Sequence, residues 1–292
     1  MTNPANSQER ESRVTFLASY PRSGNTWIRI FLQNLLDKSE STTNINNLNI
    51  GKRSSERNWF DSLCGFSTAN LSHDEVDHLK PTIYSWYSKQ CLEPDYIKIH
   101  DAYSTLATEN SKHTLHGIKC LYIIRNPLDI VVSLAAYGKM SIDETVIFIN
   151  NTNAKFNDLQ RGMNLHLRET VSSWSNHVKS WTTSPDINVH VIRYEDMTNF
   201  PENTFKSIVN FLGLKASSEE ILKAITNSQF SSLKKQEDKT GFIEGPDSIN
   251  FFKNGYTGSW KSTLNDRQIN AIVSQHKDIM SLYKYLDISD KA

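Results

Sequence analysis

The chain has 292 residues, of which 38% are hydrophobic, so it can bury a substantial core, and one large domain is favoured over two. Its 32 basic and 32 acidic side chains cancel, so we expect no nucleic-acid partner, which usually demands a basic surplus. The chain lacks the run of about eighteen apolar residues that spans a membrane, its first ten residues are polar, and its three cysteines lack CxxC spacing. We therefore predict a single domain over 1–292, flexible at 1–12, in a cytoplasmic protein without a membrane partner.

Short apolar runs alternate with helical patterns along the chain. The run VTFLASY predicts a buried parallel strand over 14–20, and apolar residues spaced i, i+3, i+4 and i+7 predict a helix over 28–35. The run IKCLYII predicts a second strand over 118–124, followed by a helix with Asn126 as N-cap and Pro127 in its first turn. Further strands are predicted over 95–99 and 188–193, and further helices near 168–183, 201–213, 218–226 and 265–285.

This alternation predicts an α/β domain with a mainly parallel sheet. Three stretches interrupt it, at 38–60, 139–167 and 231–257. Long loops in a compact domain are usually lids or disordered segments, so the charged run 234–239 is interpreted as a solvated surface on a mobile lid. Glu195 and Asp196 adjoin on a predicted strand, where neighbours point to opposite faces, and are interpreted as structural.

The turn after the first strand has the composition of an anion site. It reads Tyr20-Pro21-Arg22-Ser23-Gly24-Asn25-Thr26-Trp27 and leads into a helix. A helix N-terminus presents unpaired N–H groups, a glycine lets the backbone approach an anion, and an arginine adds charge. A capped helix with a solvated arginine is the alternative interpretation. A nucleotide kinase would need GxxxxGK[ST], but one glycine stands here and no lysine follows it.

The turn after the second strand has the same form. Arg125 stands at the carboxyl end of that strand, where ligands of open α/β sheets bind. Two such turns, each with an arginine at a strand end, indicate a ligand that is anionic at both ends. The nine histidines and three cysteines form no metal-ligand cluster in the sequence, so no metal is expected.

Five blocks of the chain resemble the cytosolic-type sulfotransferases, which use 3′-phosphoadenosine 5′-phosphosulfate (PAPS) as the sulfuryl donor. YPRSGNTW (20–27) and YIIRNPLDIVVS (122–133) are similar to that family's 5′-phosphosulfate and 3′-phosphate motifs. The further blocks match in the same order: IKIH (97–100), RYEDM (193–197) and FFKNGYTGSWK (251–261). The pattern is closer to the bacterial branch, because the animal enzymes have YPKSGTTW.

The resemblance implies a single three-layer α/β domain with the P-loop kinase-like sulfotransferase fold, and a donor that lies across the two turns. It implies that the 5′-phosphosulfate is cradled by Arg22, Ser23, Gly24, Asn25 and Thr26. After transfer of the sulfuryl group the donor becomes 3′-phosphoadenosine 5′-phosphate (PAP). The resemblance implies that the adenosine and 3′-phosphate of the nucleotide are held by Trp27, Arg125, Ser133, Tyr194, Ser228, Phe230, Lys253, Asn254 and Gly255.

Five features depart from the family pattern. Arg22 stands where the animal enzymes have lysine, which replaces a point charge by a planar fork. The family's His-Leu-Pro is here His100-Asp101-Ala102, so we expect a different edge of the acceptor pocket. Lys253-Asn254 replaces Arg-Lys, and Ser259 replaces an aspartate. The segment KSTLNDRQIN after Trp260 lacks the animal dimer motif, so the oligomeric state stays open.

The resemblance also implies a mechanism. His100 falls where the family keeps its catalytic base, and an imidazole with a pKa of about 6.5 can accept the acceptor's proton at neutral pH. Lys98 and Arg22 are expected to stabilise charge on the sulfuryl group and the leaving phosphate, since sulfuryl transfer mainly needs positioning and charge stabilisation. Asp101 is a rival base, although an unperturbed carboxylate is the weaker one.

These expectations describe a sulfotransferase acting on a small-molecule acceptor. The acceptor atom stays open between a hydroxyl oxygen and an amine or guanidine nitrogen. Aromatic residues in segments that can border its pocket are Tyr84, Trp86, Tyr87, Tyr103 and Tyr137. Two alternatives remain, a P-loop-like nucleotide kinase and a non-catalytic nucleotide-binding module.

Overall fold

The computed structural model describes residues 12–37, 42–106, 117–158, 165–245, 251–252 and 255–286. Several predictions therefore lie outside the described residues: the flexible start, apart from Ser12, and the nucleotide contacts of Lys253 and Asn254. Every described helix is too short or too polar to cross a membrane.

The centre of the described chain is a sheet of five strands in the order β2-β3-β1-β4-β7. The strands are β1 (Val14–Ser19), β2 (Lys52–Arg53), β3 (Asp95–Ile99), β4 (Lys119–Ile124) and β7 (Asn188–Arg193). All neighbours pair in parallel, with β1 between β3 and β4. Their carboxyl ends therefore meet at one edge, and the prediction of a parallel sheet is confirmed.

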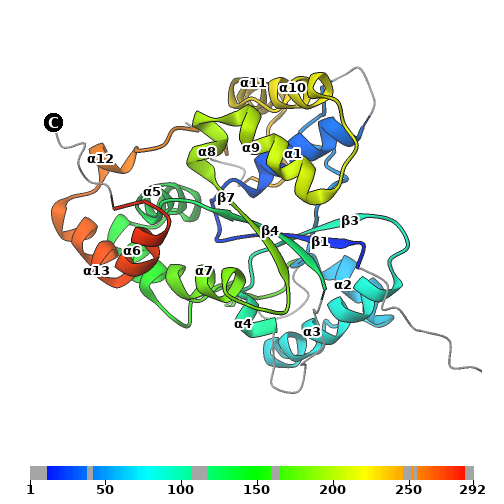
Figure 1. Cartoon of the computed structure of the whole chain (residues 1–292). Coiled ribbons are helices and arrows are strands. Elements are labelled where there is room, and N and C mark those ends of the chain that lie inside the picture. Colours follow the sequence, from blue (N-terminus) through cyan, green and yellow to red (C-terminus); the bar gives the residue numbers. More distant parts are fainter. Residues whose placement is uncertain are drawn as a thin grey trace, which may run out of the picture.

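Helices cover both faces of this sheet, which gives the predicted three layers (Figure 1). They are α1 (Asn25–Leu36), α2 (Arg57–Cys64), α3 (His73–Gln90), α4 (Tyr103–Leu106), α5 (Pro127–Gly138), α6 (Ile142–Asn150), α7 (Trp174–Thr182), α8 (Tyr194–Asn199), α9 (Pro201–Leu212), α10 (Ser218–Asn227), α11 (Phe230–Thr240), α12 (Trp260–Thr263) and α13 (Asp266–Leu282). In Figure 1, α1, α9 and α10 lie on one side of the sheet, and α5, α6, α7 and α13 lie on the other.

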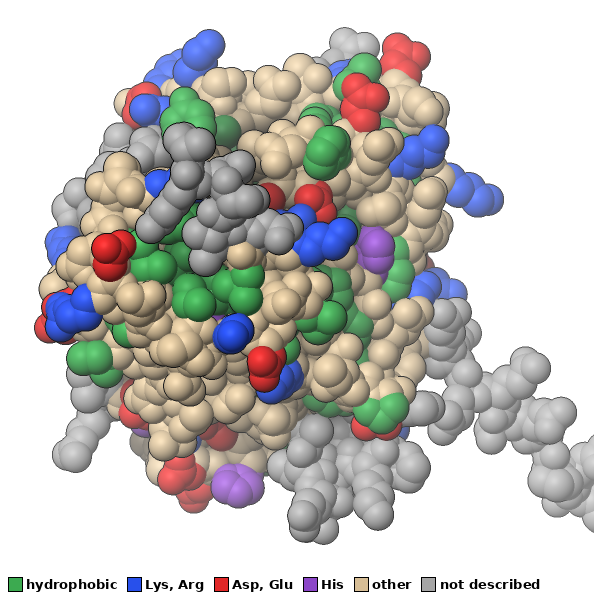
Figure 2. Space-filling view, turned by 60° about the vertical axis from the view of Figure 1, so that its left-hand side comes forward, with side chains coloured by type: hydrophobic (Ala, Val, Ile, Leu, Met, Phe, Trp, Pro, Cys, Tyr) green, Lys and Arg blue, Asp and Glu red, His purple; other side chains and the backbone are tan. Residues whose placement is uncertain are grey.

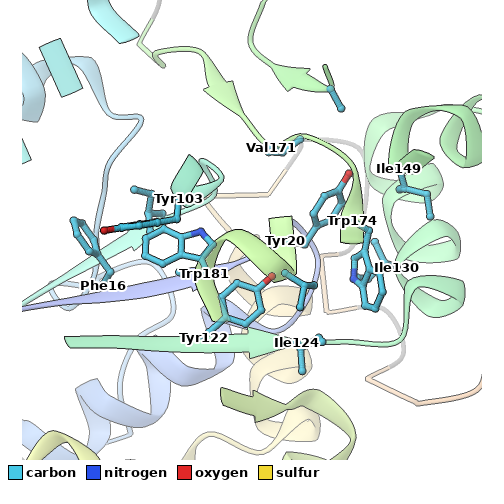
Figure 3. Packing of buried hydrophobic residues seen from close by; sticks show 14 of the residues in the cluster. Phe16, Tyr20, Tyr103, Tyr122, Ile124, Ile130, Ile149, Val171, Trp174 and Trp181 are labelled. Carbon is cyan, nitrogen blue, oxygen red and sulfur yellow. The ribbon is translucent and has the colours of Figure 1, made fainter. Parts of the chain in front are cut away.

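The alternation of side chains along β1 divides the core between these layers. Leu17 packs with Phe31 and Phe205 on the side of α1 and α9. Phe16 points to the other face, where it meets Trp181 of α7 edge-on at 6.0 Å between ring centroids. Figure 3 shows this second cluster, which continues along the sheet to other large aromatic residues. Both faces of the strand are buried, as a central parallel strand requires.

The three stretches expected to be loops carry more structure than predicted. They contain all or part of β2, α2, α6 and α11, and also β5 (Lys155–Phe156), which pairs antiparallel with β6 (Glu169–Thr170) just beyond the second stretch. In α6, Ser141 and Glu144 form a reciprocal capping box, a start signal that the sequence carries openly. The helix expected over 168–183 begins only at Trp174, because β6 occupies its first part.

Two smaller expectations are also wrong. Glu195 and Asp196 lie in α8 rather than on a strand, although their structural role holds for Glu195, which accepts the N–H of Asn126 at 3.0 Å. The charged run 234–239 belongs to α11, where Glu237 is buried and accepts the backbone N–H groups of Phe251 and Phe252. A helix places one residue of such a run inward, which a count of charges does not reveal.

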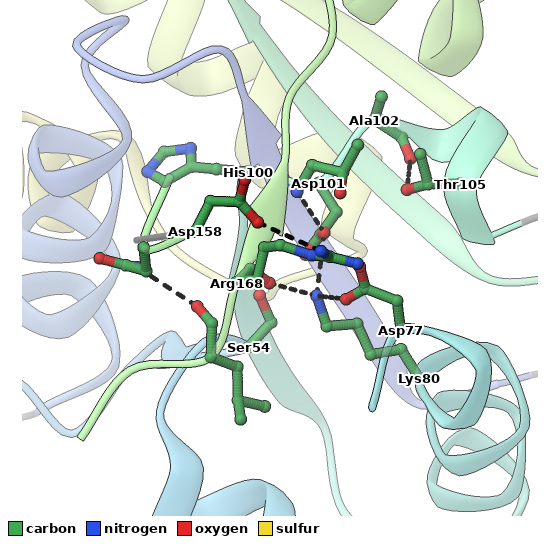
Figure 4. A network of polar contacts seen from close by, with 12 residues as sticks. Ser54, Asp77, Lys80, His100, Asp101, Ala102, Thr105, Asp158 and Arg168 are labelled. Atoms are coloured by element: carbon green, nitrogen blue, oxygen red, sulfur yellow. Dashed lines mark hydrogen bonds and ion pairs between the residues drawn. The ribbon is translucent and has the colours of Figure 1, made fainter. Parts of the chain in front are cut away.

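A buried ionic network supports the end of β3. Lys80 of α3 lies between Asp77 at 2.9 Å and Asp101 at 3.1 Å, and it also donates to the carbonyl of Arg168 (Figure 4). Arg168 in turn pairs with Asp77 at 2.6 Å. Removing one partner of such a network costs about 3–5 kcal/mol, because an uncompensated buried charge is left behind. The segment after His100 is therefore firmly held.

Candidate active site

The carboxyl ends of β1, β3 and β4 open into a cavity of about 880 Å³. Figure 2 shows this side of the molecule, with hydrophobic side chains gathered in a hollow and Lys and Arg side chains beside it. Predicted site residues that line the cavity are Arg22, Gly24, Asn25, Thr26, Trp27, Lys98, His100, Arg125, Ser133, Tyr194, Phe230 and Gly255. The cavity thus brings together residues from opposite ends of the chain.

The first turn needs its glycine. Gly24 caps α1 in the left-handed conformation with φ of 100°, and a Cβ atom there would lie 2.6 Å from Cδ2 of Tyr194. No side chain caps α1 and no acidic residue stands in its first turn, whereas α3, α6, α10 and α13 each have a capping box. The N-terminus of α1 is therefore open to an anion.

Three buried hydrogen-bond donors around this turn, besides the acceptor Oδ1 of Asn25, have no hydrogen-bond partner among the described residues. They are Oγ of Ser23, Nε1 of Trp27 and Nε of Arg125. Buried polar groups are normally satisfied, so donors left open beside an uncapped helix N-terminus fit a bound anionic ligand. The residues present thus suit a nucleotide with charged ends.

Arg22 lies on the second junction rather than over the start of α1. Its Nε donates to Oγ of Ser133 at 3.1 Å, and its guanidinium lies 4.7 Å and 4.2 Å from the ring centroids of Tyr137 and Phe251. Burial lowers the pKa of Arg22 to about 10, so it still carries its charge at neutral pH. Arg22 and Ser133, predicted for opposite ends of the nucleotide, are therefore in contact.

Arg125 ties the two turns together. Its Nη1 donates to the carbonyl of Arg22 at 2.9 Å, its Nη2 to the carbonyl of Tyr256 at 3.3 Å, and it lies over the ring of Tyr194. The N-terminus of α5 differs from that of α1, because the side chain of Asn126 accepts the N–H of Leu128. At this junction the charge of Arg125, rather than a free helix end, is available to an anion.

The predicted adenine and late-loop residues meet at Gly255. Tyr194 donates from its hydroxyl to the carbonyl of Gly255 at 3.1 Å, and a Cβ atom on Gly255 would lie 2.6 Å from the ring of Phe230. Trp27 meets the ring of Tyr194 edge-on at 5.9 Å. Ser228 is fully buried, bonds the carbonyl of Ile225 at 3.1 Å and does not line the cavity.

The hydrogen bonding of His100 defines its tautomer. Nδ1 lies 2.7 Å from the carbonyl oxygen of Ser19, and since a carbonyl only accepts, Nδ1 carries the proton and Nε2 the lone pair. Burial, and then the charge of Lys98, lower the pKa of His100 well below its usual value, so the ring is neutral. Nε2 has no hydrogen bond to any described residue, and the ring lines the cavity.

A second histidine backs His100. Nε2 of His177 donates to the carbonyl of His100 at 3.1 Å, and its Nδ1 accepts from the hydroxyl of Tyr122 at 2.8 Å. Burial lowers the pKa of His177 to about 3, so this ring is also neutral. His177 could not be recognised from the sequence, because it lies 77 residues after His100 and the two meet only in the fold.

Lys98 belongs to a charge cluster that the sequence did not reveal. Its ammonium lies 3.9 Å from Glu244, and the same carboxylate takes a bidentate pair of hydrogen bonds from Arg29 at 2.7 and 2.9 Å. Although burial acts in the opposite direction, the bonds from Arg29 bring the pKa of Glu244 down to about 2. Burial lowers the pKa of Lys98 to about 8.

Two expectations about the acceptor side need correction. Of the aromatic residues considered, Tyr137 lines the cavity, whereas Tyr84 and Tyr103 are core residues, Trp86 is exposed and Tyr87 packs on Trp59. Tyr84, Trp86 and Tyr87 belong to α3 and Tyr103 to α4, and none of these four lines the cavity.

The rival base Asp101 is buried and occupied. It holds the ammonium of Lys80 and accepts the N–H of Thr170 at 2.9 Å, and it is not among the residues that line the cavity. Figure 4 shows the ring of His100 pointing away from this network. Asp101 therefore supports the backbone beside His100.

Comparison with known proteins gives one consistent result. Residues 12–284 match a family described as the sulfotransferase domain. The chain is 25% identical over 284 residues to cytosolic sulfotransferase 8 of Arabidopsis thaliana, which covers 91% of this chain and 76% of that protein. It is 25% identical over 278 residues to a 3-alpha-hydroxysteroid sulfotransferase of Cavia porcellus, which covers 92% and 84%.

Solved structures show the same fold. A retinol dehydratase in complex with retinol and PAP is 17% identical with a TM-score of 0.60, over 93% of this chain and 82% of that one. A mouse sulfotransferase complexed with PAP is 20% identical with a TM-score of 0.57, over 93% and 85%.

Proposed function

The chain belongs to the sulfotransferase family, and we propose that it transfers a sulfuryl group from PAPS to a hydroxyl group of a small-molecule acceptor, with His100 as the general base. The observation that carries this proposal is the free Nε2 lone pair of His100 at a cavity that also holds Arg22 and Arg125. A cavity that holds both anion-binding groups and a neutral imidazole suits transfer from an anionic donor to a neutral hydroxyl.

We infer the donor site from the two junctions. The open N-terminus of α1, with Ser23, Gly24, Asn25 and Thr26, would hold the 5′ end, and Arg125 with Ser133 the 3′-phosphate. Trp27, Tyr194 and Phe230 supply flat faces for the adenine. Gly255 lines the cavity and would contribute to this site from the late segment, while the contacts expected of Lys253 and Asn254 lie outside the described residues. When bound, PAPS supplies the sulfuryl group.

The protein's own groups then do three things. His100 Nε2 accepts the acceptor's proton, and the Ser19 carbonyl keeps Nδ1 protonated so that the ring presents its basic side. Lys98 and Arg22 provide positive charge at the cavity, where burial makes each charge more effective than in water. For Arg22 to reach the 5′ end, its side chain must leave Ser133.

No group of three or more potential metal ligands occurs among the described residues. A kinase would also need a phosphate-gripping lysine after Gly24, and Asn25 stands there. Calorimetric titration of PAP and of ATP with magnesium distinguishes the two functions. PAP should bind at least about tenfold more tightly, since only PAP has a 3′-phosphate for Arg125.

His100→Ala tests the catalytic assignment. We expect its turnover of PAPS with a panel of phenols and alcohols to fall about 10²–10⁴-fold. PAP affinity should change little, because His100 touches the acceptor side. A His78→Ala variant on the exposed face of α3 is the control. Turnover within a factor of a few of the unchanged protein would reject His100 as the base.

The remaining assignments follow from the relatives. The family match over residues 12–284 and the central five-stranded sheet of the described residues support the proposal of one domain over 1–292. The relatives named cytosolic sulfotransferases support a cytoplasmic location. A small-molecule acceptor is supported by retinol in one structural neighbour, and we propose neither a nucleic-acid nor a membrane partner.

A further inference from the structure

One carboxylate in the cavity is used neither by the fold nor by the mechanism above. Glu169, on β6, lines the cavity and is only 9% exposed. Its main chain pairs with Phe156 of β5, but its carboxylate makes no hydrogen bond or ion pair with any described residue. Glu244, the other carboxylate of the cavity, is by contrast engaged by Arg29 and Lys98. A buried carboxylate without a partner is costly, so a group that complements it is to be expected from a ligand.

The backbone places Glu169 beside the proposed base. The N–H of Thr170 donates to the carboxylate of Asp101 at 2.9 Å, and the carbonyl of Thr170 accepts the N–H of Ala102 at 2.8 Å. His100 precedes Asp101 and Glu169 precedes Thr170, so the two residues adjoin the pair of segments that these hydrogen bonds connect. Because Lys80 also holds Asp101, this arrangement is fixed from below. Glu169 and His100 thus line the same cavity from adjoining backbone segments.

The charges around Glu169 leave it undercompensated. Burial, and then the carboxylate of Asp101, raise the pKa of Glu169 to about 7 against the opposing cations. The charged and titratable groups that face it or share its end of the cavity are Asp101, Lys98, Lys80, Arg53, His100, His166 and Glu244. The nearest cations have acidic partners of their own: Lys80 has Asp77 and Asp101, Lys98 has Glu244, and Arg53 has Glu56 at 3.9 Å.

We propose that Glu169 recognises the acceptor by pairing with a protonated amino group, so that the preferred substrates are hydroxyl compounds that also carry an amine. This inference rests on the proposed function and names its acceptor class. A cation gains more than a neutral hydroxyl from a desolvated carboxylate, because the charge-assisted hydrogen bond is roughly twice as strong. The hydroxyl to be sulfated would lie at His100 and the amine at Glu169.

Matched pairs of hydroxyl compounds test the proposal. Para-hydroxybenzylamine is compared with para-cresol, and aminopentanol with pentanol, by calorimetric titration of the protein with and without saturating PAP and by turnover with PAPS. The unchanged protein should prefer the amine member of at least one pair by about tenfold. Glu169→Gln should abolish that preference, whereas Glu93→Gln, at an exposed position, should retain it. The readout is the ratio within a pair, whatever happens to absolute rates.

The outcomes separate this inference from the proposed function. Equal affinity for both members of each pair, or a preference that survives Glu169→Gln, overturns the role of Glu169. A fall in kcat for amine and des-amino acceptors alike, with unchanged KM, would show instead that Glu169 transfers protons, which also overturns it. Failure of the unchanged protein to bind PAP would reject the proposed function itself. That result does not depend on whether the protein binds amines.

Proton release provides an independent readout. A bound ammonium favours the ionised form of Glu169, so binding near pH 7 should release roughly half a proton, given a free pKa of about 7. Affinity for para-hydroxybenzylamine should therefore rise as pH increases through about 7, and affinity for para-cresol should not. Titrations in buffers of different ionisation heat measure this release. No release, or equal release in Glu169→Gln, contradicts the proposal.

Discussion

The guanidinium of Arg125 donates a hydrogen bond of 2.9 Å to the main-chain carbonyl of Arg22, so the two strand-to-helix junctions are directly connected. The bond joins the ends of β1 and β4, which are neighbours in the sheet. A second bond from Arg125 reaches the carbonyl of Tyr256 in the late segment. The side chain of Arg125 therefore fixes the two proposed anion subsites relative to one another.

Arg125→Lys should weaken PAP binding while the charge is kept. Lysine is a point charge and cannot reproduce the planar fork that reaches Arg22 and Tyr256, so we expect a loss of about tenfold or more. Calorimetric titration with PAP measures it. Arg267→Lys makes the same change where the side chain is 75% exposed and should leave affinity unchanged. Equal affinities in the two variants would contradict the link between the junctions.

Gly24→Ala should disrupt the nucleotide site more than a strained backbone alone explains. Both Gly24 and Gly213 have positive φ, of 100° and 70°, but a Cβ atom meets Tyr194 at 2.6 Å only at Gly24, while Gly213 has open space. Both alanine variants should lose about 1 kcal/mol of stability from strain. Only Gly24→Ala should also lose PAP affinity, and a similar loss in Gly213→Ala would show that the steric argument is wrong.

The rate should fall at alkaline pH because Lys98 loses its charge. Its pKa is lowered to about 8, so the cation is present below that pH and disappears as pH rises through it. We expect kcat/KM, which reports the free enzyme, to decline above about pH 8. Lys98→Arg should remove this decline, since arginine stays protonated. A profile that declines equally in the variant would assign the alkaline limb to another group.

His177 should make the protein sensitive to acid. Its pKa is about 3 in the folded protein, below the usual value of about 6.5 in an unfolded chain. Above about pH 6.5 both states are neutral there, and as pH falls the unfolded state binds the proton first. The free energy of unfolding should drop by up to about 1.4 kcal/mol per pH unit from this residue.

Urea unfolding at pH 7.5 and pH 5.5 measures that drop. In His177→Gln the amide can still donate to the carbonyl of His100 but does not titrate, so its drop should be smaller by about 1 kcal/mol. His78→Gln on the surface of α3 should behave like the unchanged protein. An identical drop in all three proteins would remove His177 as the cause.

The junctions were predictable because each is local. Pro21 to Trp27 and Arg125 to Pro127 carry their strand end, glycine or proline and helix start within a few residues. The ion pair of Arg29 with Glu244 could not be predicted, because most of the chain separates the two residues and they meet only in the folded protein. Glu169 was hidden for a similar reason, since the sequence around it reads as a helix and the hairpin forms through contacts with Asp101 and Ala102.

The helices in the stretches expected to be loops show the limit of apolar periodicity. In α11, buried positions are Leu233 and Glu237, so half of its inward face is charged and no apolar stripe is visible. In α6 the capping box of Ser141 with Glu144 was the better signal, whereas α2 and α11 have no side-chain cap. Hydrogen-bonding residues at helix starts thus predict elements that hydrophobic spacing overlooks.

The ring of His100 is open to exchange on one side only. Its Nδ1 proton faces the carbonyl of Ser19, which cannot take it away, and His177 closes the inner wall as a neutral donor. In the proposed mechanism, a proton received at Nε2 therefore leaves through the cavity, where the sulfated product would lie. His100 would then lose its proton for the next cycle only when that product departs. If product release is slow, the appearance of protons in solution should lag behind transfer of the sulfuryl group.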